Sequence, residues 1–159
     1  MKIVIIGATG TVGTAVVKQL AERHEVIQVG KTRGQYQADI TDADSVRALF
    51  ARIVKVDAIV STAGNLHFGP LTEMTAEQFK IGLHDKLLGQ IELALIGQHH
   101  LKDGGSITLT SGIVGDEPIL YGVNATTVNA ASAGFVRAAA IEGSLLPGVL
   151  PGTAVMVQV

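Results

Sequence analysis

Three glycines near the start of the chain have the spacing of an anion-binding loop. Gly7, Gly10 and Gly13 stand between an apolar run, Lys2–Ile6, and a segment with helical spacing of apolar residues, 14–22. In such a loop the first glycine makes a tight turn, the second admits a phosphate, and the third lets the helix pack closely. The helix would direct unpaired N–H groups and its positive dipole end at the loop. The sequence therefore predicts a pyrophosphate site. The alternative is a tight turn without a ligand, because G-x-x-G-x-x-G only partly matches the dinucleotide fingerprint.

Two basic residues follow the second predicted strand, residues 25–29. In dinucleotide-binding domains an acidic residue at this place binds the ribose 2′-hydroxyl of NAD, and basic residues bind the 2′-phosphate of NADP. The chain continues here with Gly30, Lys31, Thr32 and Arg33, without an acid. We therefore predict NADP (NADPH) rather than NAD. The planar guanidinium of Arg33 would bind the 2′-phosphate through paired hydrogen bonds, and the ammonium of Lys31 would attract it as a compact charge. The alternative is that both are solvated charges on a turn.

The segments that position these residues alternate between strands and helices. Only a few residues connect the second strand to the third, so no crossover helix is expected there. The repeated units predict a parallel sheet in a Rossmann-type, doubly wound α/β fold, a three-layer α/β/α sandwich in a single domain of residues 1–159. Further strands are predicted at 36–40, 56–61, 106–110 and 153–159, a turn at 103–105, and helices from 41 or 42 to 53, after Thr75 to about 101, and from 124 to about 145.

Composition excludes several classes of function. Of the 159 residues 47% are hydrophobic and 16% charged, and no apolar run approaches the roughly 18 residues of a membrane span. The start lacks the pattern of a signal peptide, so a cytoplasmic protein is expected. The absence of cysteine excludes disulfides and thiolate metal sites, and no metal is predicted. The net charge of −2 gives no electrostatic reason to expect nucleic acid as a partner.

Four motifs occur in an order and at distances that resemble the short-chain dehydrogenase/reductase family, over about residues 1–142. They are GATGTVG at 7–13, ADIT at 38–41, STAG at 61–64 and GSITLTSG at 105–112. The chain looks most like the small, atypical bacterial members of that family. The resemblance implies a nicotinamide cofactor, a small-molecule substrate, and hydride transfer.

Residue by residue, the resemblance also implies a cofactor site. Asp39 and Ile40 would meet the adenine, and Ala63 and Gly64 would lie along the cofactor beside the ribose. The residues that would line the pyrophosphate are Gly7, Thr9, Gly10, Thr11, Val12 and Gly13.

The chain departs from the family at the catalytic positions. Family members use a Ser on the substrate oxygen, a Tyr that donates a proton, and a Lys four residues later that lowers the pKa of that Tyr. Ser111 fits the serine, but Asn124 stands at the tyrosine position and Val128 at the lysine position. The Asn that completes the family's tetrad aligns with Lys86.

One arrangement would give this site a proton donor and a cation in other positions. Tyr121 lies three residues before the expected tyrosine, so a shifted loop would bring its hydroxyl near Ser111, and Lys86 would supply the missing cation. In the alternative, Tyr121 is a loop residue at a subunit contact, and Lys86 is a charge at the cofactor or a salt-bridge partner.

The resemblance carries two further expectations. Relatives continue beyond the strand near residue 159 into a segment that closes over substrate, so the chain is expected to be C-terminally shortened and its site open to water. Family members also pair their two long helices, here about 80–101 and 124–142, which predicts a homodimer or homotetramer.

Two classes of function follow. The first is an NADP-dependent oxidoreductase for a small carbonyl or alcohol, with Ser111 orienting the oxygen and a non-standard proton source. The alternative is a non-catalytic NADP-binding protein, a sensor or assembly module on the same fold.

Overall fold

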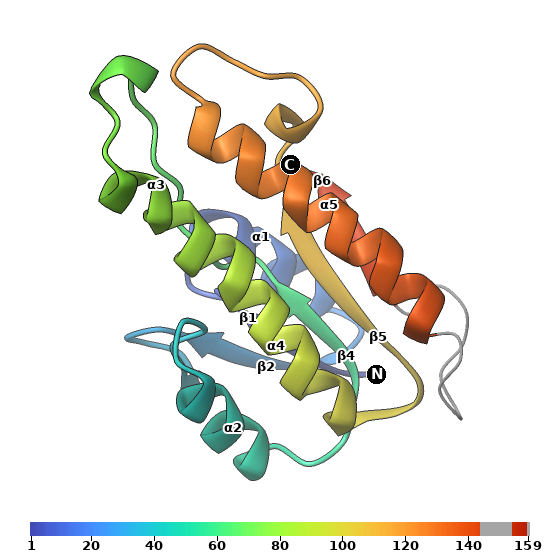
Figure 1. The fold of residues 1–159 in the computed structure, drawn as a ribbon. Helices are drawn as coiled ribbons and strands as arrows, with labels where there is room; N and C mark the ends of the chain where they lie inside the picture. Colours follow the sequence, from blue (N-terminus) through green and yellow to red (C-terminus); the bar gives the residue numbers. More distant parts are fainter. Residues whose placement is uncertain (144–153, 159) are drawn as a thin grey trace.

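The computed structural model describes residues 1–143 and 154–158. Within them, six parallel strands form one sheet in the order β3-β2-β1-β4-β5-β6 (Figure 1). β1 pairs with β2 on one side and with β4 on the other. The winding therefore reverses between β1 and β4, as predicted for a doubly wound sheet, and the ligand site of such folds lies at that reversal. The strands are β1 (Lys2–Ile6), β2 (Glu25–Gly30), β3 (Tyr36–Gln37), β4 (Val56–Ser61), β5 (Leu101–Ser111) and β6 (Ala154–Gln158).

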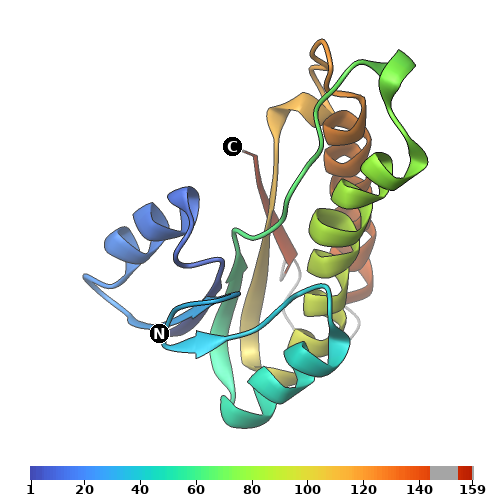
Figure 2. The ribbon, with the colours of Figure 1, turned by 90° about the vertical axis from the view of Figure 1, so that its left-hand side faces the viewer.

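The helices lie on both faces of the sheet, which confirms the predicted three layers. Figure 2 shows α1 on one face and the other helices on the opposite face. A π-helical segment, Leu83–Leu88, joins α3 to α4 and makes one long helical column. No helix among the described residues is long and apolar enough to cross a bilayer. The helices are α1 (Thr11–Leu20), α2 (Ala43–Arg52), α3 (Ala76–Gly82), α4 (Gly89–Gly97) and α5 (Val123–Gly143).

The central strand is apolar because both of its faces are buried. Val4 and Ile6 pack in the larger core cluster, together with Phe50 of α2. Ile3 and Ile5 belong to the smaller cluster, against which residues of α1 pack. A strand enclosed in this way needs a continuous apolar run rather than an alternating one.

Two helices begin at side-chain caps. The Asp42 carboxylate accepts a hydrogen bond from the N–H of Asp44 at the start of α2. Thr75 and Gln78 form a reciprocal capping box at the start of α3. Each cap satisfies N–H groups that the first helical turn leaves unpaired, so both helices begin where the sequence predicts.

Three local expectations need correction, and one feature of the fold was not predicted. α1 begins at Thr11 rather than at residue 14, and β3 contains only residues 36–37 of the predicted 36–40. The predicted turn at 103–105 lies inside β5 as an irregularity where the register with β4 shifts. The π-helical segment was not predicted. Residues 144–153 and 159, which include the end of the predicted helix from 124 to about 145 and both ends of the predicted strand 153–159, lie outside the described residues.

Candidate functional site

The glycine loop packs too closely on its surroundings to hold side chains at two positions. Gly7 has a φ of +79°, and a Cβ there would lie 2.9 Å from the backbone nitrogen of Ala63. A Cβ on Gly13 would lie only 2.0 Å from the carbonyl oxygen of Gly7. Gly10 is less confined, since its Cβ would meet only that same oxygen, at 3.3 Å. The first and third glycines are therefore required by packing, and the second leaves the exposed side of the loop open.

The glycine loop ends at the start of α1, which has no side-chain cap. Gly10 is the N-cap residue, so no side chain caps the helix, and no acidic residue stands in its first turn. Thr11 and Val12 begin the helix and are exposed. Uncapped N–H groups and the positive end of the helix dipole attract an anion.

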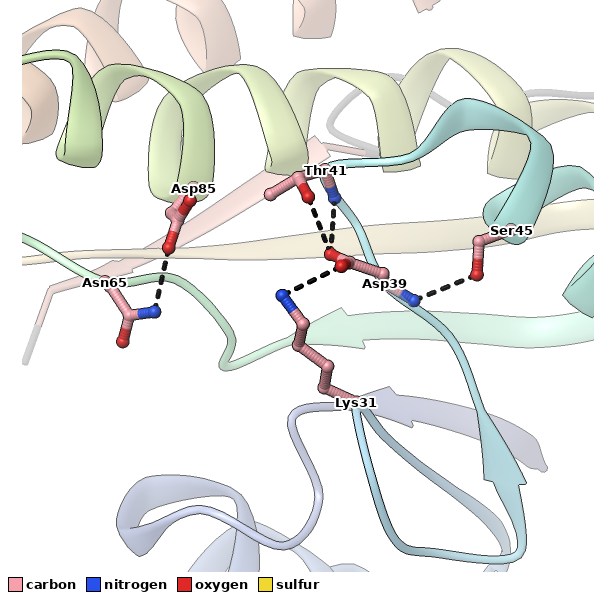
Figure 3. Close-up of polar contacts among 6 residues, drawn as sticks. All are labelled: Lys31, Asp39, Thr41, Ser45, Asn65 and Asp85. Carbon is pink, nitrogen blue, oxygen red and sulfur yellow. Dashed lines mark hydrogen bonds and ion pairs between the residues drawn. The ribbon is translucent and has the colours of Figure 1, made fainter. Parts of the chain in front are cut away.

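A cavity of about 150 Å³ lies at the carboxyl ends of β1, β2 and β4. It thus opens at the reversal of strand order, where nucleotides bind in folds of this type. Figure 3 shows five of its polar lining residues. Seven predicted cofactor residues line the cavity, namely Gly7, Thr9, Lys31, Asp39, Ile40, Ala63 and Gly64.

An ion pair joins the ends of β2 and β3 at this cavity. The Lys31 ammonium lies 2.8 Å from a carboxylate oxygen of Asp39. The other oxygen of Asp39 accepts hydrogen bonds from the N–H and the hydroxyl of Thr41, at 3.0 and 2.8 Å (Figure 3). The hydrogen bond from Lys31 holds the pKa of Asp39 below its ordinary value, and Asp39 in turn raises the pKa of Lys31. Both groups are therefore charged at neutral pH.

Arg33 connects the turn after β2 to the glycine loop. One guanidinium nitrogen donates a hydrogen bond to the carbonyl oxygen of Thr9, at 3.3 Å. The turn is tight, because a Cβ on Gly30 would lie 2.2 Å from the carbonyl oxygen of Arg33. Only one guanidinium donor takes part in a hydrogen bond among the described residues, so Arg33 keeps donors for an anion.

Lys86 is a buried cation on the π-helical segment. It is only 9% exposed, and burial lowers the pKa of its ammonium. No hydrogen bond or ion pair holds that ammonium among the residues described. Gly64 packs directly against the base of the Lys86 side chain, since a Cβ on Gly64 would lie 2.7 Å from the Lys86 Cβ. A π-helical turn often marks a functional position, and here it carries a largely buried lysine beside the strand-end loop.

The structure engages Ser111 and Asn124 in internal hydrogen bonds. The Ser111 hydroxyl is buried and donates to the carbonyl oxygen of Asn129, at 3.1 Å. The Asn124 side chain accepts from the N–H of His67 at 3.0 Å and donates to the carbonyl oxygen of Phe79 at 2.6 Å. These contacts fasten the end of β5 and the start of α5 to their neighbours.

Tyr121 lies on the loop before α5, in a left-handed conformation with a φ of +63°. Its carbonyl oxygen accepts a hydrogen bond from the N–H of Gly69, and its side chain is 53% exposed. It lines a groove of about 380 Å³ between the loops after β4 and β5. Among the described residues its side chain has no hydrogen bond to Ser111 or Lys86. The structure thus gathers predicted cofactor residues, but no hydrogen bond or ion pair among the described residues joins those that the sequence places at or near the family's catalytic positions, namely Lys86, Ser111, Tyr121 and Asn124.

Three polar side chains of the cavity were not predicted from the sequence as site residues. Thr41, Asn65 and Asp85 all line it. Thr41 is the last residue of the ADIT motif, and Asn65 directly follows the STAG motif, so carrying the cofactor site to the end of the first motif and one residue beyond the second would have found them. Asp85 precedes Lys86, but a lone acid on a predicted helix carries no signal of its own.

The sheet order and the glycine loop at its reversal define a Rossmann domain of the dinucleotide-binding type. The family model described as "Enoyl-(Acyl carrier protein) reductase" matches residues 2–145. Versicolorin reductase 1 of Aspergillus parasiticus is 31% identical over 148 residues, which cover 86% of this chain and 55% of that protein. The chain belongs to the short-chain dehydrogenase/reductase family, and it spans about half the length of curated relatives such as this one.

Solved structures show the same fold. The protein lin1944 from Listeria innocua is 44% identical, with a TM-score of 0.89 over 94% of this chain and 74% of that one. A small-chain dehydrogenase in complex with NADPH is 30% identical, with a TM-score of 0.82 over 89% of this chain and 64% of that one. Both structures confirm that the chain has the fold of this family.

Replacing the buried cation tests whether it is unpaired. Lys86→Met is expected to raise the free energy of unfolding at pH 7, because a buried ammonium without a partner costs folding free energy. The gain should shrink as the pH rises through the lowered pKa of the folded state towards the ordinary value of 10.5, where Lys86 loses its charge in the unfolded chain as well. Urea unfolding between pH 7 and about 10.5 measures both effects.

Lys80→Met is the matched control, because Lys80 is exposed on α3. Its substitution should change stability little at either pH. A Lys86→Met protein that is less stable than the wild type at pH 7 would show that the ammonium is satisfied in the fold.

Proposed function

We propose that this chain binds NADPH in the cavity between β1, β2 and β4 and acts as an oxidoreductase on a small carbonyl or alcohol. The observation that carries the proposal is that seven predicted cofactor residues line one cavity beside the uncapped start of α1. The related small-chain dehydrogenase with NADPH supports the choice of cofactor. When bound, the reduced nicotinamide supplies the hydride for reduction of a carbonyl.

Each part of the site has a role in this proposal. The N–H groups of Thr11 and Val12 bind the pyrophosphate at the start of α1. Lys31 and Arg33 bind the 2′-phosphate, and Asp39 orients Lys31 through their ion pair. The remaining cofactor residues give the cofactor its apolar and close backbone contacts, namely Gly7, Thr9, Gly10, Gly13, Ile40, Ala63 and Gly64.

The catalytic roles differ from the family pattern. We assign Lys86 as the cation that attracts the developing charge on the substrate oxygen, because it is desolvated and unpaired among the described residues. The proton then comes from Tyr121, after a movement of its loop, or from solvent. Ser111 and Asn124 are positioning residues in this scheme, since their side chains are bonded inside the fold.

One observation favours the second candidate, a non-catalytic NADP-binding protein. The positions of the family's Tyr and Lys hold Asn124 and Val128, and both are completely buried. Neither side chain can protonate a substrate. A sensor or assembly module would keep the cofactor cavity and need no proton donor.

Arg33→Ala tests the cofactor assignment. The variant should weaken NADPH binding about tenfold or more, because a hydrogen bond to a charged group is worth about 1.5–3 kcal/mol. NADH binding should change much less, since NADH lacks the 2′-phosphate. Fluorescence titration with both cofactors measures the ratio of the two affinities.

Arg47→Ala is the control, because Arg47 pairs with Asp44 on α2 and does not line the cavity. It should leave both affinities unchanged. An Arg33→Ala protein with the NADPH preference of the wild type would refute the assignment.

Turnover separates the two candidate functions. We expect NADPH oxidation with at least one member of a panel of small aldehydes, ketones and quinones, followed by the loss of absorbance of the reduced nicotinamide. Lys86→Met should lower kcat while NADPH still binds, because the cation acts mainly on the charge of the transition state. Binding of NADPH without turnover of any panel member would favour the non-catalytic protein.

We also propose that the outer faces of α4 and α5 associate with a second copy of the chain. Figure 1 shows these two helices side by side on one face of the molecule. Leu88 and Leu95, seven residues apart, are each 49% exposed, and Ile141 on α5 is 70% exposed. Exposed apolar side chains on these helices would be buried in such an interface.

Leu88→Glu tests this association. A charge in a buried apolar interface would be desolvated, so the variant should have a smaller mass in solution than the wild type. Size-exclusion chromatography with light scattering measures that mass. Leu120→Glu is the control, since Leu120 is 79% exposed on a loop. A monomeric wild type, or an unchanged mass for Leu88→Glu, would contradict the proposal.

A further inference from the structure

Two carboxylates line the nucleotide cavity, and they differ in how many hydrogen bonds they accept. Asp39 accepts three, one from Lys31 and two from Thr41. Asp85 accepts one, from the side-chain amide of Asn65 at 2.8 Å. Figure 3 shows the two groups on separate elements around the same space. Asp39 is therefore nearly saturated, whereas Asp85 keeps most of its acceptor capacity.

The position of Asp85 is fixed from two sides. It belongs to the π-helical segment, next to the buried Lys86, and Gly64 packs closely against that lysine. Asn65 follows Gly64 directly and holds one carboxylate oxygen, Oδ2. The other oxygen, Oδ1, accepts no hydrogen bond from any described residue. The loop after β4 therefore orients an acceptor whose second oxygen is available to a ligand.

The composition of the cavity indicates which ligand group meets that oxygen. Ile6, Ala38, Ile40 and Ala63 supply apolar walls suited to a flat ring. A carboxylate repels phosphate, so it belongs near a part of the nucleotide that donates hydrogen bonds. The exocyclic amine of adenine is a donor attached to a flat ring, and it fits both features.

We propose that Asp85, oriented by Asn65, accepts a hydrogen bond from the exocyclic amino group of the cofactor's adenine. The inference rests on the proposed binding of NADPH in this cavity. It changes the role of Asp39, which the family resemblance places at the adenine: Asp39 serves the 2′-phosphate end by holding Lys31. The chain then selects its cofactor at two separate points, the base through Asp85 and the phosphate through Lys31 and Arg33.

The test compares NADPH with its hypoxanthine analogue, in which a carbonyl oxygen replaces the amino group. The wild type should bind NADPH about tenfold or more tightly, because the analogue loses a hydrogen bond to a charged group and sets an oxygen against the carboxylate. Asp85→Asn should bring the ratio of the two affinities close to one, since the new amide can donate to that oxygen. Both reduced cofactors can be titrated by fluorescence.

Two further variants complete the experiment. Asp39→Asn should keep the preference for adenine and lower the preference for NADPH over NADH. Asp44→Asn is the matched control, because its carboxylate is 90% exposed on α2 and lies outside the cavity. It should change neither ratio.

Several results would overturn the inference. Equal wild-type affinities for the two bases, or an unchanged preference in Asp85→Asn, would refute it while NADPH binding stands. An equal loss of both affinities in Asp85→Asn would place Asp85 at another group and also refute it. Loss of base preference in Asp39→Asn alone would transfer the role to Asp39. If the wild type binds neither cofactor, the proposed function fails together with the inference.

Discussion

The close packing of the glycine loop on the end of β4 is the constraint on which the rest of the site depends. Gly7 takes a positive φ and lies against the backbone of Ala63, and Gly13 lies against Gly7. Any side chain at either position would push α1 away from the sheet. Because the approach is that close, the uncapped start of α1 faces the point where the strand order reverses. The loop, the helix dipole and the cavity are thus consequences of one packing requirement.

The opposite wall of the site depends on a helix that does not follow regular geometry. A π-helical segment carries Asp85, which lines the cavity, and next to it Lys86, which is buried. Gly64 lets the strand-end loop lie directly on Lys86, and Asn65 then reaches Asp85. The backbone irregularity, the glycine and the two charges therefore form a single arrangement. A regular helix would place these two side chains in other directions.

The sequence predicts the fold well because burial on both faces leaves a strong pattern. The apolar run of β1, the glycine loop and the caps at Asp42 and Thr75 each act locally, so each can be recognised without the rest of the chain. The irregularity in β5 could not be recognised in this way, because Asp103 and its glycines look like a turn until β4 is placed beside them. The hydrogen bonds of Asn124 were hidden for a similar reason, since its partners lie 57 and 45 positions away.

The start of α5 is held to its neighbours by the side chain of Asn124. Asn124, which the sequence predicts to stand at the position of the family's tyrosine, joins three segments through hydrogen bonds to His67 and Phe79. Its oxygen comes so close to Gly82 that a Cβ there would lie 2.3 Å away. A tyrosine ring could not occupy this space without moving α3. Asn124 thus serves the packing of α5 on α3, and in the proposed site the positive charge near the cofactor comes from Lys86 on the neighbouring helical column.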